Sequence, residues 1–178
     1  MHSMTEFFSH FAFAQLFLCA LLLLPFWQKN QSIRLYILLM ICAGGYILGG
    51  ILSPLTLHSL MWWVGHVTGS ALPGVFWLVS LSVFGDHVVL KRWQYIVASL
   101  TLVIPISAAI IQAATGAQIA NAPALAGLVK YGAMSLELVL IVHALIIASK
   151  HWRDDLVQER RYIRGGVITI SAMYILGE

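Results

Sequence analysis

Charged residues are scarce in this chain, and their scarcity excludes an ordinary soluble domain. Only 10% of the 178 residues are Asp, Glu, Lys or Arg, whereas 60% are hydrophobic. A soluble domain carries about 25% charged residues. The hydrophobic residues gather in runs of roughly 20, the length that a helix needs to cross a hydrocarbon core of about 30 Å. The composition therefore predicts an integral membrane protein of the all-α class, a polytopic bundle of transmembrane helices.

Cysteines and catalytic motifs are also sparse. The two cysteines, Cys19 and Cys42, lie inside apolar runs and have no CxxC spacing, so neither a disulfide framework nor a metal site is indicated. The sequence contains no HExxH motif, no glycine-rich phosphate loop and no recognisable set of nucleophile, base and orienting residue. We therefore expect no catalytic residue, no metal and no cofactor, and we do not expect an enzyme.

Six apolar runs are candidates for membrane spans. They cover approximately residues 7–27, 33–52, 57–84, 93–114, 125–149 and 162–178. The sixth run is shorter than a full span and closes on Glu178. We therefore expect that the sequence is cut within its sixth helix, and that a seventh helix follows in the longer protein.

Prolines and glycines mark special positions within these runs. Pro73 and Pro105 lie inside the third and fourth runs, where each should kink its helix or split it into two halves. In the second run Gly45 and Gly49 are four residues apart, and each has a further glycine beside it, Gly44 and Gly50. Such pairs favour close packing of helices over a ligand contact.

The distribution of Lys and Arg predicts how the chain is oriented. The connections at 28–34, 85–92 and 150–164 hold two, two and five of these residues, whereas the N-terminus and the connections at 53–56 and 115–124 hold none. Because basic residues remain on the cytoplasmic side, the N-terminus is expected outside, in the periplasm if the source is a Gram-negative bacterium, and the amphipathic segment 150–164 inside, in the cytoplasm. The bilayer and its anionic lipid headgroups are thus expected partners of this segment.

Ionisable residues at membrane depth are the candidates for a binding site. A charge near the centre of a span costs about 2.5 to 3.5 kcal/mol on insertion scales, so such a residue should face the interior of the bundle. Glu137 lies midway along the fifth run, and Lys130 is seven residues earlier on the same helical face. With His66, Trp62 and Trp63 of the third run, they could line a ligand pocket that opens to the outside.

Other interpretations of these residues stay open. Glu137 could be protonated or hydrogen-bonded between helices without any ligand. His66 and His143 are each a single histidine on an apolar helix, and for both we favour a role in packing. Trp62 and Trp63 lie near the predicted outer boundary, where an aromatic belt is expected in any case.

Two stretches of the sequence resemble a known family. ALPGVFWLVSLSVFGDHVVLKRWQ (71–94) and DDLVQERRYIR (154–164) are similar to segments of the membrane sensor domains of bacterial AraC-type transcription regulators. Gln158 departs from the pattern, since an acidic residue is expected there, although Glu159 is adjacent. The resemblance implies a helical bundle followed by a cytoplasmic helix-turn-helix domain. This chain contains no such domain, so any contact with DNA would be made by a domain that is absent from it.

The first functional hypothesis is therefore a sensory or anchoring membrane domain of a one-component transcription regulator. Ligand binding would shift the fifth helix and its cytoplasmic extension, in which Asp155, Arg160, Arg161 and Arg164 are the candidate relay and orientation residues. A small-molecule ligand and a second copy of the chain are further candidate partners. The alternative is a small-solute transporter or a subunit of one, although no internal repeat supports it.

Overall fold

The computed structural model describes residues 2–52, 59–84, 90–115, 123–149 and 169, and nearly all of them are helical. The helices are α1 (His2–Leu23), α2 (Gln31–Ile51), α3 (Leu60–Phe84), α4 (Arg92–Thr115) and α5 (Pro123–Ser149), with a short 3₁₀-helix, η1 (Leu24–Phe26), after α1. This confirms the all-α prediction for the described residues. The segment 150–164 lies outside them, as does the sixth run at 162–178 except for Thr169, which is helical.

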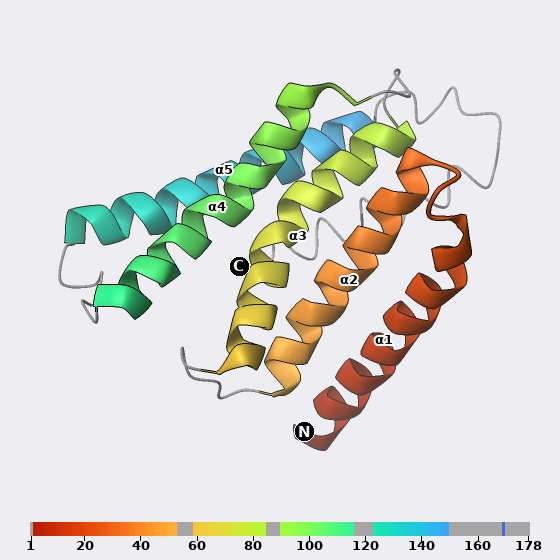
Figure 1. The fold of residues 1–178 in the computed structure, drawn as a ribbon, viewed down its shortest axis with the longest axis horizontal. Coiled ribbons are helices and arrows are strands. Elements are labelled where there is room, and N and C mark those ends of the chain that lie inside the picture. Colours follow the sequence, from red (N-terminus) through yellow and green to blue (C-terminus); the bar gives the residue numbers. More distant parts are fainter. Residues whose placement is uncertain (1, 53–58, 85–89, 116–122, 150–168, 170–178) are drawn as a thin grey trace.

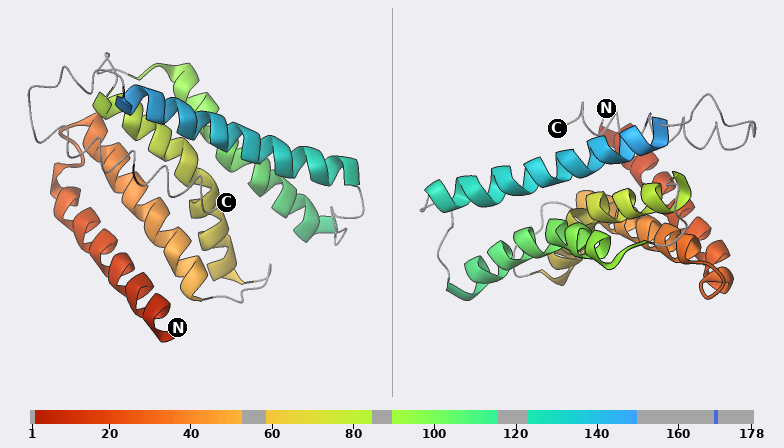
Figure 2. Two further views of the ribbon diagram at one scale, coloured as in Figure 1. Left: turned by 180° about the vertical axis from the view of Figure 1, so that it is seen from behind. Right: turned by 90° about the horizontal axis from the view of Figure 1, so that it is seen from above.

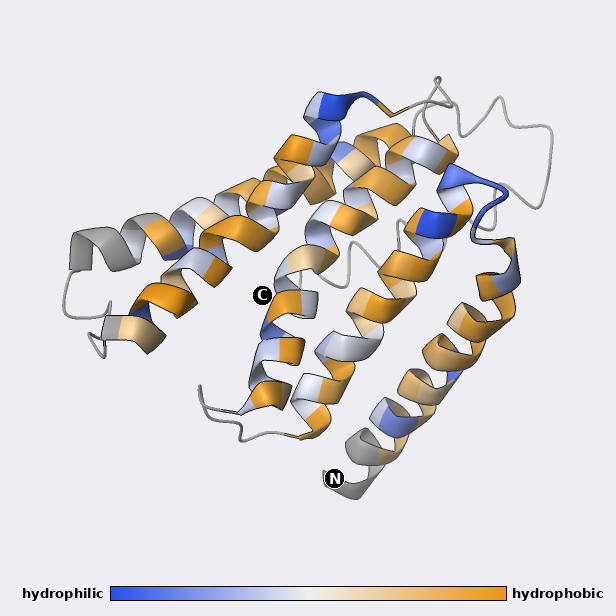
Figure 3. Ribbon diagram, in the orientation of Figure 1, coloured by the Kyte–Doolittle hydropathy of each residue, from blue (hydrophilic) through white to orange (hydrophobic). Residues whose placement is uncertain are grey.

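Each of the five helices is long enough and apolar enough to cross a membrane. Their apolar stretches are 20 to 25 residues long, which corresponds to about 30 Å or more at a rise of 1.5 Å per residue. Hydrophobic residues predominate along the helices (Figure 3), and large hydrophobic side chains are exposed on each of the five, as expected where the surroundings are lipid rather than water. The chain is therefore a multi-pass membrane protein by the length and composition of its helices.

Helix α3 occupies the centre of the bundle. It packs against α2 on one side and against α4 and α5 on the other, while α1 packs against α2 at the edge (Figures 1 and 2). The core is built from buried side chains of four helices and from Leu90, which precedes α4; its members include Leu35, Cys42, Trp77, Leu140 and Ala144. Among residues 7–23 of α1 none is buried, so this helix meets its surroundings over most of its circumference.

Glycines allow α2 and α3 to approach each other closely. A Cβ atom placed on Gly49 would lie 3.1 Å from the Cα of Gly65, and one placed on Gly45 would lie 2.6 Å from the Cγ2 of Thr68. Either distance is shorter than an ordinary van der Waals contact, so a larger residue would push the two helices apart. The small residues thus serve backbone-to-backbone packing, which is how helices associate in lipid.

A second close approach joins α3 to α4. A Cβ atom on Gly74 would lie 2.7 Å from the Oγ1 of Thr101. Thr101 is fully buried, and its hydroxyl donates a hydrogen bond of 2.8 Å to the carbonyl of Ala98 one turn earlier. This bond satisfies a polar group that would otherwise be costly in an apolar interior.

Pro73 and Pro105 both lie inside continuous helices. Pro73 is buried in α3 and Pro105 lies in α4. Neither proline splits its helix into two, but the axis of α3 bends near its middle (Figure 1). A bend is the expected consequence of a proline ring, because the ring removes one backbone hydrogen bond and clashes with the preceding turn.

The turn between α1 and α2 has well-defined local causes. Pro25 is the second residue of η1, in the first turn, where its missing N–H removes no helical hydrogen bond. The side chain of Asn30 then accepts a hydrogen bond of 3.1 Å from the backbone N–H of Ser32 and caps α2. Gln31 donates a side-chain hydrogen bond to the hydroxyl of Tyr95 near the start of α4.

The described basic residues at helix ends therefore gather at one end of the bundle. Lys29 and Arg34 flank the start of α2, and Lys91 and Arg92 lie at the start of α4. Hydrophilic residues mark these two places at the same end of the molecule in Figure 3. A membrane protein obeying the positive-inside rule would have this end in the cytoplasm.

Candidate functional site

A polar contact between α3 and α5 is the main feature of the bundle interior. The indole Nε1 of Trp77 donates a hydrogen bond of 2.7 Å to the Nδ1 of His143. Trp77 is only 2% exposed, and its ring centroid lies 5.9 Å from that of His143 and 6.1 Å from that of Trp93. One indole side chain therefore contacts aromatic rings of both α4 and α5.

The chemistry of this contact is constrained by the donor. An indole N–H can only donate, so the Nδ1 of His143 must be unprotonated and its proton must reside on Nε2. Burying the indole N–H in an apolar interior without an acceptor would cost several kcal/mol at the upper end of transfer scales. The hydrogen bond thus fixes both the tautomer of His143 and the relative position of α3 and α5.

This contact was not predicted from the sequence. The sequence favours a packing role for His143, and Trp77 enters only as part of the stretch 71–94 that resembles the family. One signal was available: Trp77 lies seven residues before the end of α3 at Phe84, and His143 lies six residues before the end of α5 at Ser149. Because α3 and α5 are expected to run in the same direction across the membrane, residues at similar distances from the ends of these helices lie at similar depth in the membrane.

The aromatic residues at the start of α3 form a compact group. The rings of Trp62 and His66 are stacked with centroids 4.5 Å apart, and Trp63 meets Trp62 edge-on at 5.2 Å. The Nε2 of His66 is enclosed and has no hydrogen-bond partner among the described residues. An enclosed polar atom without a partner is unusual, which makes this histidine a second point of interest.

Glu137 lies on the packed side of α5. The residues Ala133, Leu140, Ala144 and Ala148 are all buried, and Glu137 continues their spacing of three or four residues while being half-buried itself. This side of the helix faces the bundle, as expected for a carboxyl group at membrane depth. Lys130, two turns earlier, is exposed.

The two sets of candidate residues belong to parts of the bundle that diverge. Trp62, Trp63 and His66 are in the first half of α3, and Lys130 is in the first half of α5. In Figures 1 and 2 the first half of α5 lies beside the far end of α4, away from the first turns of α3. α3 and α5 meet in their C-terminal halves instead, near Trp77 and His143. A shared pocket at the outer end stays a prediction.

The candidate relay residues of the cytoplasmic segment lie outside the described residues. They are Asp155, Arg160, Arg161 and Arg164. Within the described ranges no group of three or more His, Cys, Asp or Glu side chains is arranged to hold a metal ion. What the described residues of the site offer is thus hydrogen bonding and helix positioning.

Comparison of the chain with protein family models, with curated proteins and with solved structures found no match.

Proposed function

We propose that this chain is the membrane-embedded sensory or anchoring domain of a one-component AraC-type transcription regulator. In this proposal it lies in a bacterial inner membrane with its N-terminus outside and the segment 150–164 in the cytoplasm. The two stretches of family resemblance and the alternation of basic and non-basic connections support it. Contact with DNA would be made by a helix-turn-helix domain that is not part of this chain.

The hydrogen bond between Trp77 and His143 is the observation that carries the proposal furthest. It joins the central helix to α5, which is followed in the sequence by the basic segment 150–164. A ligand that changes the bend of α3 would move α5 through this contact and through the core around Leu140 and Ala144. The ligand must bind one arrangement of the two helices more tightly than the other, since only a difference in affinity shifts such an equilibrium.

Glu137 is the proposed ligand-binding residue of this system. It lies on the packed side of α5, six residues before His143. A charged group of the ligand that pairs with Glu137 would therefore act on the helix that carries His143. Lys130 on the same helical face would contribute the opposite charge nearer the outer rim. The ligand class that suits this pair is a small polar molecule that reaches the bundle from outside.

A transcriptional reporter driven by the full-length protein tests the proposal. Glu137→Ala should abolish the response to the ligand while the protein still accumulates in the membrane, and Trp77→Phe should uncouple ligand binding from the response. Glu137→Gln separates charge from shape. If the response and the ligand affinity were unchanged in all three variants, the pocket and the relay would both be wrong. A reading frame that stopped soon after Glu178 would contradict the regulator itself.

A small-solute transporter is the second candidate. Pro73 and Pro105 inside two packed helices, with a half-buried carboxyl group on a third, are features that moving helices in transporters also show. Uptake measured in proteoliposomes distinguishes the two functions. Accumulation of a solute that depends on Glu137 would favour the transporter over the regulator.

A further inference from the structure

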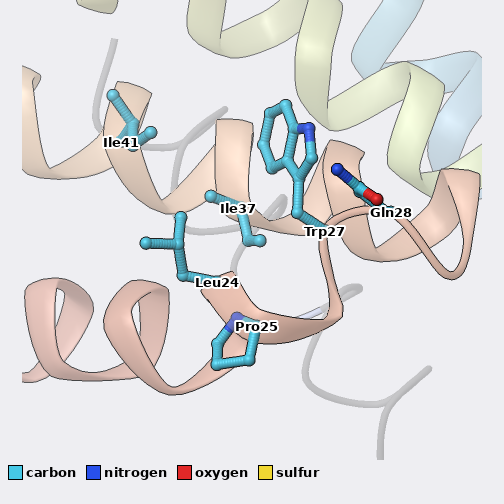
Figure 4. Close-up of a pocket in the computed structure, with 6 residues that line it drawn as sticks. All are labelled: Leu24, Pro25, Trp27, Gln28, Ile37 and Ile41. Carbon is cyan, nitrogen blue, oxygen red and sulfur yellow. The ribbon is translucent and has the colours of Figure 1, made fainter.

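A hollow of about 530 Å³ lies between η1, with the turn that follows it, and the first half of α2. Leu24 and Pro25 of η1 lie opposite Ile37 and Ile41 of α2, and Trp27 and Gln28 lie at the end nearer the turn (Figure 4). Its volume is within the range of roughly 300 to 1,000 Å³ that is typical of small-molecule sites. The hollow is therefore apolar along its length and polar at one end.

Two basic residues, Lys29 and Arg34, lie close in the sequence to residues that line this hollow. Arg34 is exposed and lies three residues before Ile37 and seven before Ile41, so it is on the same helical face one and two turns from the lining side chains. The Nζ of Lys29 lies 5.0 Å from the ring centroid of Phe26. This cation–π contact holds the ammonium group near the end of η1.

These cations have no counter-charge nearby in the sequence. No Asp or Glu occurs from Phe7 to Gly85. The N-terminus of α2, capped at Asn30, adds the positive end of a helix dipole to the same turn. Charge complementarity therefore calls for an anionic group that residues 7–85 do not supply.

We infer that this hollow is a binding site for one anionic phospholipid, with an acyl chain along Leu24, Ile37 and Ile41 and the phosphate at Lys29 and Arg34. The apolar part of the hollow would not stay empty, because the side chains that line an empty space lose dispersion contacts. In a bilayer an acyl chain fills it without displacing water. Selectivity for the lipid then comes from the headgroup, since the acyl chain is equally at home in the surrounding bilayer.

The lipid would also act on the bundle. It would bridge η1 at the end of α1 to α2, the helix against which α1 packs and the first neighbour of α3. In Figure 1 α1 lies at the edge of the bundle, and none of residues 7–23 is buried. A bound lipid would therefore strengthen the attachment of α1. This inference does not depend on the proposed regulatory function.

Native mass spectrometry of the purified chain, exchanged from mixed phosphatidylglycerol and phosphatidylcholine into detergent, tests the site. We expect one retained phosphatidylglycerol per chain. The exposed pair Lys29→Gln and Arg34→Gln should weaken retention by about 30-fold, since each cation near an anionic headgroup contributes roughly one factor of five. The pair Lys91→Gln and Arg92→Gln removes the same charge at the same end and should leave retention unchanged.

A second variant tests the acyl part. Ile41→Trp fills the hollow and should abolish selective retention, whereas Ile110→Trp, at a position that is equally exposed on α4 (52% in both cases), should not. Equal retention of the two lipids by the unmodified chain would overturn the inference, and so would unchanged retention in Ile41→Trp. A dimer that dissociates in Ile41→Trp while the lipid stays bound would show that a second copy occupies the hollow instead.

Discussion

The hydrogen bond between Trp77 and His143 couples two side chains that are 66 residues apart in the sequence. Hydrogen bonds between membrane helices contribute less than their apolar surroundings suggest, about 0.6 kcal/mol on average and up to about 1.7 kcal/mol, because the unfolded chain in lipid also finds partners. The buried position of Trp77 favours the upper part of that range. The bond would then matter more for fixing the geometry of α3 against α5 than for overall stability.

A double-mutant cycle measures this coupling directly. Trp77→Phe and His143→Phe should each destabilise the protein, and the double variant should be more stable than the sum of the single effects predicts by about 1 kcal/mol. The measurement is unfolding by SDS in mixed micelles. A second cycle pairs Trp77→Phe with Lys130→Met. Lys130 is exposed and lies on α5, the helix that carries His143, so this cycle should show no coupling. Equal coupling in both cycles would mean that the effect is not carried by the hydrogen bond.

His66 leads to the opposite expectation. Its Nε2 is enclosed and lacks a hydrogen-bond partner among the described residues, and an unsatisfied polar atom of this kind costs about 1 to 3 kcal/mol. His66→Phe keeps a ring stacked on Trp62 and removes the polar atom. We therefore expect a gain in stability of about 1 kcal/mol in the same unfolding assay.

The contrast with His143→Phe serves as the control for this prediction. Among the described residues, His143 has a hydrogen-bond partner and the Nε2 of His66 has none, so the same substitution should change stability with opposite signs. A loss of stability in His66→Phe would indicate that Nε2 has a partner beyond the described residues. If that partner were a ligand, the aromatic group of Trp62, Trp63 and His66 would become the better candidate for the sensory pocket.

At the scale of helices, the packing of α2 on α3 depends on glycine. Gly49 faces the backbone of Gly65, whereas no atom of the described residues lies within 4 Å of a Cβ atom added at Gly50. Adjacent glycines on one helix therefore meet different surroundings. This difference provides a matched pair of positions for mutation.

Gly49→Leu should destabilise the bundle by about 1 to 3 kcal/mol, because the added side chain forces the two backbones apart. Gly50→Leu should be neutral or slightly stabilising, since leucine is a better helix former than glycine and has room. SDS unfolding followed by circular dichroism measures both. Similar losses in the two variants would show that glycine serves helix flexibility here and not close approach.

The helices themselves were largely predictable, whereas their contacts were not. Runs of apolar residues set the positions of α1 to α5 to within a few residues, because helix length in a membrane protein follows from the thickness of the bilayer. The small residues around Gly45 and Gly49 also pointed to a packing face. The neighbour of that face was not predictable, because the spacing of small residues is the same whichever helix lies opposite.

The candidate site shows the same limit. The position of Glu137 on the packed side of α5 was predictable, because exposing a carboxyl group to lipid is costly. The pairing of Trp77 with His143 depends on the choice of α5 as a neighbour of α3 and on the rotation of both helices. An apolar surface that extends around each helix leaves that rotation unspecified, since the hydrophobic pattern does not distinguish lipid from protein.

For the whole molecule, the placement of basic residues leads to an orientation that can be tested without knowledge of the function. Lys29, Arg34, Lys91 and Arg92 lie at one end of the bundle, and Gln31 and Tyr95 link the two connections at that end through a side-chain hydrogen bond. Both connections must therefore be on the same side of the membrane. The positive-inside rule assigns that side to the cytoplasm.

Reporter fusions at successive positions test this orientation. Alkaline phosphatase, which is active only outside the cytoplasm, should be active when fused after residue 55 or 118 and inactive after residue 30, 88 or 164. A green fluorescent protein series at the same positions should give the reverse pattern, so that a fusion that fails to accumulate is recognised by the absence of both signals. Phosphatase activity after residue 164 would place the segment 150–164 outside. It would then separate α5 from any cytoplasmic output and contradict the relay, while leaving the packing of α3 against α5 untouched.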